Sequence, residues 1–540
     1  MRLSLPVAAL AAASLVSCSN DPKPSAALVK PAPEPAIEKG SAEEIVAITQ
    51  PQPVVKKPLD SRPLPKLAKL GTGKKGAAPS GKSKWAIGFG GLGVDVPRDL
   101  AVTAAGEIYV AGLFDGQLDL GAAGKFTAIV APPNPALPKG ELKTGMPAAP
   151  PTDAYLIKLG TNGKLAWART FGAGREDAAN GVAVSKDGSR VVVVGNYLDE
   201  IKHGTFSKKS AGSDDLFIAA FDKAGEPDFL FTAGGIDSDG ANAIVATPDG
   251  GWVIGGSFTS AVTFVGTKLV SKGGTDAFLM KLAATGDLEW IKQFGGTYND
   301  TIRYLAVDGQ GSLFVQGILR DKADWGGDKP LVAAGNADND VVLAKYDSNG
   351  DHLWSKSFGD KFDDEAGGLS VDPAGNVTMV GSFDHSISFG EGDSHKSKGL
   401  SDIFIARFSG TGQLAWAKTY GDKRYDVAVG VGCDAEGNTV VTGWFEGAID
   451  FQGETPIKST GNKDVFVIKL DPSGAATWVR TFGDKDHDQG RAVEIDDKGG
   501  IVLAGLYRFA FDAVQPALES VRADGDRIPK PDTYIVRLER

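Results

Sequence analysis

The chain has 540 residues, enough for several domains or one long array of repeats. Glycine is frequent, with 71 residues, and aromatic residues make up only 8% of the sequence. Because the glycines follow no Gly-X-Y period, the composition excludes a collagen-like protein and is typical of many short strands joined by tight turns. Two cysteines are too few for a disulfide scaffold, and a net charge of −11 disfavours nucleic-acid binding.

The first 18 residues, MRLSLPVAALAAASLVSC, combine one arginine, an apolar run and a cysteine. This run is too short for a membrane-spanning helix and indicates a secretory signal. Its ending, Leu-Val-Ser-Cys, resembles the bacterial lipoprotein signal, in which the cysteine is acylated and becomes the mature N-terminus. The resemblance implies export across the inner membrane and a lipid anchor on Cys18, at the outer membrane or cell surface. An ordinary signal peptide with a chance cysteine is the alternative.

Residues 19–82 are rich in Pro, Lys and Ala and contain no aromatic side chain. Such a segment buries too little apolar surface to offset the entropy lost on ordering, so we expect a disordered tether. Its basic character fits a position beside an anionic membrane or envelope polymer, and a simple solvated linker explains it equally well.

A repeat of about 62 residues follows, in residues 83–540. Three markers agree on seven units. The first is an aromatic residue, at Trp85, Trp167, Phe229, Trp290, Trp354, Trp416 and Trp478. The second is an aspartate six residues after a Phe-Gly-type motif, at Asp95, Asp177, Asp239, Asp300, Asp364, Asp426 and Asp488. The third is an aspartate before an apolar strand, at Asp153, Asp215, Asp276, Asp340, Asp402, Asp464 and Asp532.

Each unit holds four short strand signals; in the sixth they are VAVGVGC, NTVVTGWF, DVFVIKL and TWVRTFG. Four strands in each of seven units predict an all-β fold, a seven-bladed β-propeller. The array begins with an outer strand, about 84–91, and ends with a third strand, DTYIVRLER. We therefore expect the N-terminal strand to complete the last blade, a closure that removes exposed sheet edges.

The pattern W-x-x-x-(F/Y)-G-x-x-x-x-D, then D-x-x-G and D-x-F-(I/V)-x-K-L, resembles the bacterial β-propeller repeat called SBBP over residues 85–540. The resemblance implies the propeller fold and says little about activity. We interpret the repeated aromatic residue as packing between blades. A basic residue five positions after the third marker is interpreted as a strand-end charge.

The second marker has two interpretations. These aspartates would cap the loops between blades by accepting backbone N–H groups. Alternatively, they would ring the mouth of the central channel and attract cations. In the last such loop, GDKDHDQG, Asp484, Asp486 and Asp488 resemble the start of a calcium loop, although the glycine is one place late and no Glu stands at the twelfth position. Ca²⁺ is the only cofactor that the sequence suggests.

Two insertions, 126–151 and 509–531, interrupt the period between second and third strands of blades that become neighbours on closure. We expect them to lie side by side and to form a partner-binding edge, with tolerated surface decoration as the alternative.

Enzyme signals are weak. The GFGGLG motif at 88–93 follows no Rossmann strand, and the five histidines show no metal-ligand spacing. We expect a monomeric, non-enzymatic binding or scaffolding module for protein or polysaccharide, by analogy of fold. A glycan lyase or hydrolase with a site at the channel mouth, or a Ca²⁺-dependent adhesin, are the alternatives.

Overall fold

The computed structural model describes residues 81–121, 124–128, 151–172, 176–335, 338–451, 456–521 and 529–540. They form β-strands joined by turns, and no α-helix is present in this part of the chain. A helix able to span a membrane is therefore absent from the described ranges. The signal, Cys18 and the tether up to residue 80 lie outside them.

The strands build seven antiparallel sheets of four strands, one of which is extended by a hairpin. The strands of each blade are given from inner to outer. Blade 1 is β2 (Asp95–Val102), β3 (Ile108–Asp115), β6 (Thr152–Leu159) and β7 (Leu165–Phe171); blade 2 is β8 (Ala178–Val184), β9 (Arg190–Tyr197), β12 (Asp215–Asp222) and β13 (Pro227–Ala233); blade 3 is β14 (Asp239–Ala246), β15 (Trp252–Phe264), β16 (Thr267–Leu282) and β17 (Leu288–Gly296).

Blades 4 to 7 repeat this order. Blade 4 is β18 (Thr301–Val307), β19 (Leu313–Arg320), β22 (Asn339–Tyr346) and β23 (His352–Phe358); blade 5 is β24 (Asp364–Val371), β25 (Val377–Gly390), β26 (Asp393–Phe408) and β27 (Leu414–Tyr420). Blade 6 is β28 (Asp426–Cys433), β29 (Thr439–Phe445), β32 (Asp464–Leu470) and β33 (Ala476–Phe482); blade 7 is β34 (Gln489–Ile495), β35 (Ile501–Tyr507), β38 (Asp532–Leu538) and β1 (Ser83–Phe89).

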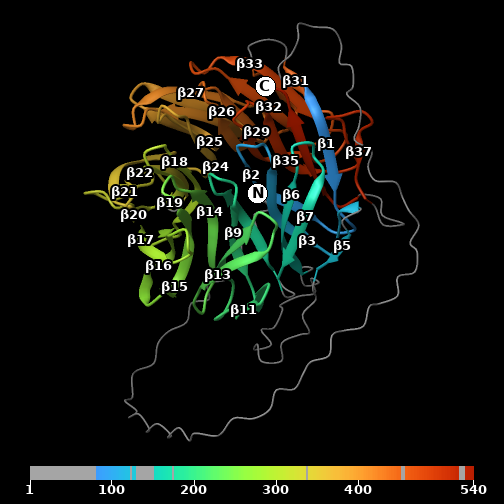
Figure 1. Ribbon diagram of the computed structural model, residues 1–540. Helices are drawn as coiled ribbons and strands as arrows, with labels where there is room; N and C mark the ends of the chain where they lie inside the picture. Colours follow the sequence, from blue (N-terminus) through green and yellow to red (C-terminus); the bar gives the residue numbers. More distant parts are fainter. Residues whose placement is uncertain are drawn as a thin grey trace, which may run out of the picture. The chain divides into compact units, whose positions relative to one another are not determined.

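The inner strands contact one another in a closed ring, β2–β8–β14–β18–β24–β28–β34 and back to β2. The seventh blade is completed by β1, which pairs antiparallel with β38 near the C-terminus, with Trp85 opposite Arg537 (Figure 1). The predicted seven-bladed propeller and its closure by the N-terminal strand are confirmed. No blade in the described ring is left with three strands, so the apolar third strand β38 is not exposed as a sheet edge.

The core consists of clusters between neighbouring blades rather than one central cluster. One cluster joins Val192 of blade 2 to Ile254 of blade 3, and another joins Val380 of blade 5 to Phe466 of blade 6. Third strands are buried on both faces, and every residue of β32 is buried. This explains why DVFVIKL reads as a continuous apolar run instead of an alternating one.

Hairpins extend several blades between their second and third strands. Four are separate small ladders: β4 (Gln117–Asp119) with β5 (Lys125–Thr127), β10 (Glu200–His203) with β11 (Phe206–Lys209), β30 (Ala448–Ile449) with β31 (Ile457–Lys458), and β36 (Ala510–Phe511) with β37 (Leu518–Glu519). The hairpin of β20 (Lys322–Asp324) and β21 (Leu331–Val332) instead pairs with β17 of blade 3 and extends that sheet. The two insertions belong to the first and last of the four small ladders, as predicted, and both hairpins contact the end of β1 or the residue after it. Residues 129–150 and 522–528 lie outside the described ranges.

The repeated aromatic residue packs against a glycine of the next blade. In each case the glycine has a positive φ and occupies the turn between the third and fourth strands. The pairs are Trp85–Gly163, Trp167–Gly225, Phe229–Gly286, Trp290–Gly350, Trp354–Gly412, Trp416–Gly474 and Trp478–Gly81. Several indole N–H groups also donate to a carbonyl in that turn, for example Trp354 to Gly410 at 3.1 Å. The predicted role of the aromatic residue in interblade packing is confirmed.

The substitution Gly412→Ala tests this contact. A β-carbon at Gly412 would lie 3.1 Å from the Trp354 ring, and the φ of +79° disfavours any other residue. We expect a loss of unfolding free energy of about 2–3 kcal/mol, from strain and lost packing together. The matched control is Gly375→Ala, which has a φ of +81° with no atom within 4 Å and should cost only the strain, about 1 kcal/mol. Equal losses in chemical denaturation would show that the aromatic contact contributes nothing.

Candidate functional site: the loop face of the propeller

One end of the propeller, here called the loop face, carries two loops from each blade. One loop joins the second strand to the third, and the other, the interblade loop, joins the outer strand to the next inner strand. The opposite end, the turn face, carries the short turns between first and second strands and between third and fourth strands. Loops on a rigid scaffold are where binding function concentrates, so the loop face is the first place to examine.

The seven aspartates of the second marker, here called the interblade aspartates, are 0–2% exposed. We expected these carboxylates to be accessible at the mouth of the channel, and this interpretation is wrong. They are buried within the loops, where they accept backbone N–H groups. The interblade aspartates are Asp95, Asp177, Asp239, Asp300, Asp364, Asp426 and Asp488.

Their hydrogen bonds are those of a loop cap. Where the loop is described, each accepts the N–H of the residue four positions earlier, as Asp300 does from Gly296 at 2.8 Å and Asp488 from Asp484 at 3.0 Å. In five of the seven, the other carboxylate oxygen accepts an N–H near the end of the second strand of the same blade; for Asp300 the donor is Arg320, at 3.2 Å. One side chain thereby joins an interblade loop to a second-to-third-strand loop.

A second buried aspartate, at the start of each third strand, lies beside the first. Between blades 4 and 5, a β-carbon at Gly359 would be 2.5 Å from Oδ1 of Asp340 and 2.6 Å from Oδ2 of Asp364, so both side chains converge on this glycine. The Oδ1 atoms of Asp340 and Asp364 are both buried without a hydrogen-bond partner in the described structure. Two carboxylates so close together resist full ionisation, and we infer that such a pair retains a proton.

The pKa values follow from this arrangement. Burial raises the pKa of Asp239, Asp300 and Asp426 to about 7, of Asp488 to about 8 and of Asp364 to about 9. The neighbouring strand aspartate raises each value further, while the backbone N–H bonds lower it. Because these carboxyls are almost fully buried, they do not form the accessible acid pair that a glycan lyase or hydrolase would need.

The acidic loop of the last blade does not assemble a calcium site. Asp488 accepts N–H groups from Asp484 and Arg508, and Asp486 lies 3.0 Å from the imidazole of His487. Within the described ranges, no group of three or more His, Cys, Asp or Glu side chains is arranged to hold a metal ion. The predicted ligand set Asp484, Asp486 and Asp488 is therefore wrong, because alternate residues of this loop point to different partners.

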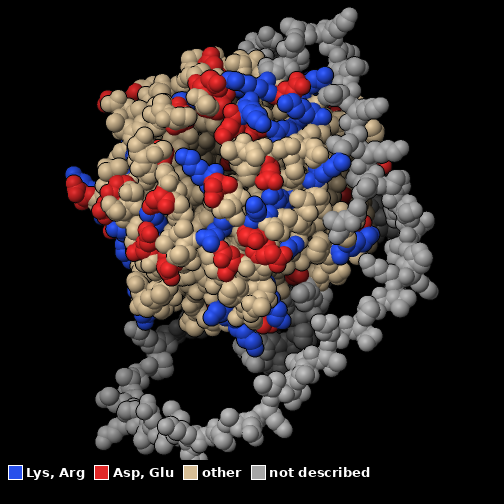
Figure 2. Space-filling view, in the orientation of Figure 1, with Lys and Arg blue, Asp and Glu red and all other residues tan. Residues whose placement is uncertain are grey.

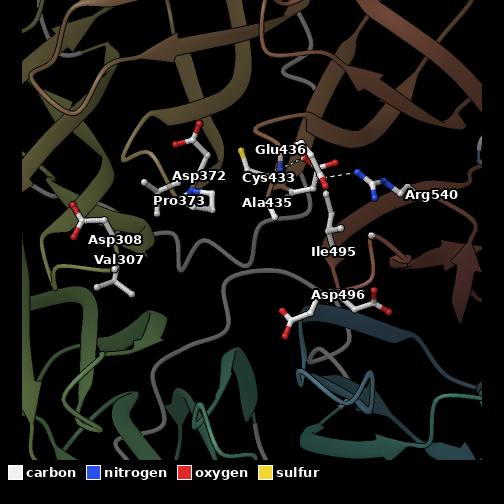
Figure 3. Close-up of a pocket in the computed structure, with 15 residues that line it drawn as sticks. Val307, Asp308, Asp372, Pro373, Cys433, Ala435, Glu436, Ile495, Asp496 and Arg540 are labelled. Carbon is white, nitrogen blue, oxygen red and sulfur yellow. Dashed lines mark hydrogen bonds and ion pairs between the residues drawn. The ribbon is translucent and has the colours of Figure 1, made fainter.

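The turn face has an acidic pocket of about 370 Å³ (Figure 3). Four of its five aspartates, all except Asp497, form ion pairs with the basic residues of the third strands. Lys469 lies 3.1 Å from Asp434, and Arg407 forms a buried ion pair with Asp372. Cys433 also borders this pocket, and burial raises the pKa of its thiol. The basic residue interpreted as a strand-end charge is thus one half of an ion pair, and this pocket is structural.

Exposed apolar side chains recur on the loop face. Leu92, Ile236, Tyr298 and Phe362 lie three or four residues after the Phe-Gly-type position in four interblade loops and are 54%, 77%, 43% and 42% exposed. Two more apolar side chains, those of Val332 on β21 and Leu400 on β26, are 58% and 49% exposed. Acidic and basic side chains are interspersed on the surface that Figure 2 shows.

One set of residues in the inner strands was not predicted from the sequence. Three positions after each interblade aspartate stands a residue of the inner strand, and in three blades it is an arginine, namely Arg98, Arg303 and Arg491. Aligning the seven units on the interblade aspartate would have found this set. What the alignment could not have shown is that all three border one cavity.

No protein-family model matches the sequence. The chain is 26% identical over 373 residues to the regulatory protein FlaEY of Caulobacter vibrioides, an alignment of 63% of this chain and 37% of that protein. It is 25% identical over 206 residues to an uncharacterized WD repeat-containing protein of Acanthamoeba polyphaga mimivirus, an alignment of 34% of this chain and 15% of that protein. The chain thus spans well under half the length of these curated relatives.

Several solved structures are similar to the chain at low sequence identity. The RRP9 WD40 repeats have a TM-score of 0.41 at 9% identity, over 85% of this chain and 99% of that one. The Dos1 propeller has a TM-score of 0.39 at 8% identity, over 85% and 95%. Hydrazine synthase of Kuenenia stuttgartiensis has a TM-score of 0.40 at 9% identity, over 75% and 92%.

The substitution Asp364→Asn tests the protonated pair. A carboxyl whose pKa is raised in the folded state stabilises the protein at low pH, and this contribution is lost as the pH rises through the folded pKa, about 9 for Asp364. We expect the variant to be more stable than the parent at pH 8 and to lose less stability between pH 5 and 9. One proton accounts for a slope of at most about 1.4 kcal/mol per pH unit.

The measurement is urea denaturation from pH 5 to 9. The control is Asp187→Asn, because Ser185 and Ser189 hold the pKa of that exposed carboxyl at about 2 and the pH slope should not change. If Asp364→Asn destabilised the protein equally at every pH, the pair would be ionised and the inference would fail.

Proposed function

We propose that the propeller is a non-enzymatic binding module that docks a partner protein on its loop face. The observation that carries this proposal is the set of exposed apolar side chains at equivalent positions of the interblade loops, above all Ile236, Tyr298 and Phe362. Exposed apolar side chains that recur on one surface mark interaction sites, whereas scattered ones need no explanation. These three belong to the loops after blades 2, 3 and 4, which are consecutive.

The type of partner follows from the chemistry of this surface. Aliphatic and aromatic side chains amid polar loops are typical of protein–protein interfaces, in which a few buried apolar anchors supply most of the binding energy. Propellers in general serve as rigid platforms for protein interactions. A polysaccharide partner remains an outcome that the experiment below distinguishes.

A lipid anchor on Cys18 and a flexible segment at 19–82 would present this platform away from a membrane. The proposal is supported by the signal-like residues 1–18 and by the basic, aromatic-free composition of the tether. It places the propeller in the cell envelope, at the outer membrane or cell surface. We also propose that the repeat is of the SBBP type, on the recurring pattern quoted above.

The loop-face variant Ile236→Ser/Tyr298→Ser/Phe362→Ser tests partner binding. We expect at least a tenfold loss of binding to envelope extract immobilised on a sensor, because three apolar anchors are removed. The control is Leu353→Ser on outer strand β23, where an equally exposed apolar residue (53%) lies away from the loops. Binding that survives the triple variant, or that is lost in the control, would contradict the proposal. Protease or glycosidase treatment of the extract distinguishes a protein from a polysaccharide partner.

The substitution Cys18→Ser tests the anchor. We expect it to abolish incorporation of a labelled fatty acid and to move the protein from the membrane to the soluble fraction, because the acylated thiol is lost. Cys433→Ser is the matched control, since it removes the other cysteine, whose thiol lies within the propeller. A Cys18→Ser protein that stays labelled and sediments with membranes would overturn the lipid-anchor proposal.

A further inference from the structure

Every inner strand contains a β-bulge at the same position. The register of the inner strand against the second strand shifts between Pro97 and Asp99 in blade 1, between Ile302 and Tyr304 in blade 4, and at the equivalent positions of the other five blades. The extra residue in each bulge lies three positions after the interblade aspartate. A bulge commonly redirects a side chain, and here the extra residue borders the central channel in six of the seven blades.

Six of the seven bulge residues, all except Gly367, border a cavity of about 330 Å³ that the inner strands line. Blades 1, 4 and 7 supply Arg98, Arg303 and Arg491, and blades 2 and 3 supply Asn180 and Asn242. The remaining two bulge residues are small or apolar. A cavity of this size is at the lower end of the range of small-molecule sites, ~300–1,000 Å³.

The two asparagines have structural partners. The amide of Asn180 donates to the carbonyl of Ala241 at 3.1 Å, and that of Asn242 donates to the carbonyl of Ile302 at 2.8 Å. Each therefore ties its inner strand to the next one around the ring. No ligand is needed to explain these residues.

The three arginines are different. None of them forms an ion pair or a hydrogen bond with another described side chain or carbonyl, and the Nε atoms of Arg98 and Arg491 are buried without a partner. Fully buried cations elsewhere in the propeller are paired: Lys281 with Asp249 and Lys469 with Asp434, for example. Arg98 and Arg491 are partly buried, and Arg303 is exposed to solvent. Because three guanidinium ions line one cavity without an ion pair, an anion between them would relieve their mutual repulsion.

Each arginine of this cluster also destabilises the charged form of its neighbours. Burial lowers the pKa of Arg98 and Arg491, the latter to about 10, and the neighbouring positive charges of this cluster lower both further.

Two acids, Asp99 and Glu494, line the same cavity, and burial raises the pKa of Glu494 to about 8. A third, Glu365, lies near Arg303; burial raises the pKa of that carboxyl, and the charge of Arg303 lowers it in part. Asp99 accepts the N–H groups of Val182 and Leu100, and burial raises its pKa to about 6.

We propose that the central channel binds a phosphate-type oxyanion between Arg98, Arg303 and Arg491. A guanidinium donates in a planar fork that matches a phosphate, and three such groups arranged around one cavity can satisfy a doubly charged tetrahedral anion from several sides. Tyr304 borders the same cavity, next to Arg303 in sequence. This site is separate from the loop face and goes beyond the function proposed above.

Two sources can supply this chemistry: free inorganic phosphate, or a phosphoryl group carried on a larger molecule such as a phosphorylated glycan. The experiment uses the mature full chain and measures thermal unfolding and calorimetric binding with inorganic phosphate, glycerol 3-phosphate and acetate at constant ionic strength. We expect an unfolding temperature that rises with the logarithm of phosphate concentration and a much smaller effect of acetate. Binding of glycerol 3-phosphate as tight as that of phosphate would indicate a group on a larger molecule; phosphate alone would indicate the free ion.

The substitutions Arg98→Gln and Arg491→Gln separate a ligand site from a structural one. We expect each to weaken phosphate binding at least tenfold and, because like-charge repulsion is relieved, to raise the unfolding temperature in phosphate-free buffer. A structural arginine would give the opposite sign in phosphate-free buffer. The control is Arg169→Gln, whose guanidinium pairs with Glu226 on the outside of the propeller and should leave phosphate binding unchanged.

Three results would overturn the proposal. The first is a parent protein without a phosphate-dependent shift or binding heat. The second is an arginine variant that binds phosphate as tightly as the parent. The third is a lower unfolding temperature of both variants in phosphate-free buffer, which would mean that the arginines stabilise the empty protein.

Discussion

The contact of an outer-strand aromatic ring with the turn glycine of the next blade holds the rim of the propeller together. It recurs in all seven blades, and each glycine has a positive φ that brings the turn under the ring. The seventh turn is split between the two ends of the described chain, where the N–H of Gly81 donates to the carbonyl of Glu539. Closure therefore repeats the interaction that joins every other pair of blades, and the N-terminal strand is needed for one complete blade and one complete rim contact.

This constraint explains where variation is permitted. The rim contacts and the buried aspartate pairs define the blades, so the loops between second and third strands can lengthen without disturbing either, as the two insertions do. The interblade loops are shorter because an aspartate at their end must reach an N–H four residues back, as Asp426 reaches Asp422. Their exposed positions are free to carry apolar residues such as Ile236, which the fold does not require.

Most of the fold was predictable from the sequence because the repeat marks its own contacts. The aromatic marker of Trp354 and the turn residue Gly412 recur at fixed spacing, and the final third strand at Asp532–Leu538 revealed that a blade had to be completed from the N-terminus. The candidate sites were harder. The spacing of Asp484, Asp486 and Asp488 suggested a shared ligand, but side-chain direction in a tight loop depends on hydrogen bonds that spacing does not specify. The channel arginines were not predicted because a β-bulge changes which residues of a strand face inward, and an alternation pattern in the sequence does not show where a bulge occurs.

Charge pairing gives a way to tell structural from functional charges in this molecule. On the turn face the aspartates are numerous, yet third-strand cations such as Lys469 neutralise them, and their concentration carries no binding role. On the loop face the interblade aspartates are neutralised by backbone N–H groups and by retained protons. The arginines of the channel form no ion pair with a described side chain, and the pKa values of Asp99 and Glu494, which share their cavity, are raised. The fold does not require arginine at this bulge, because the other four blades have Asn, Gly or Val there.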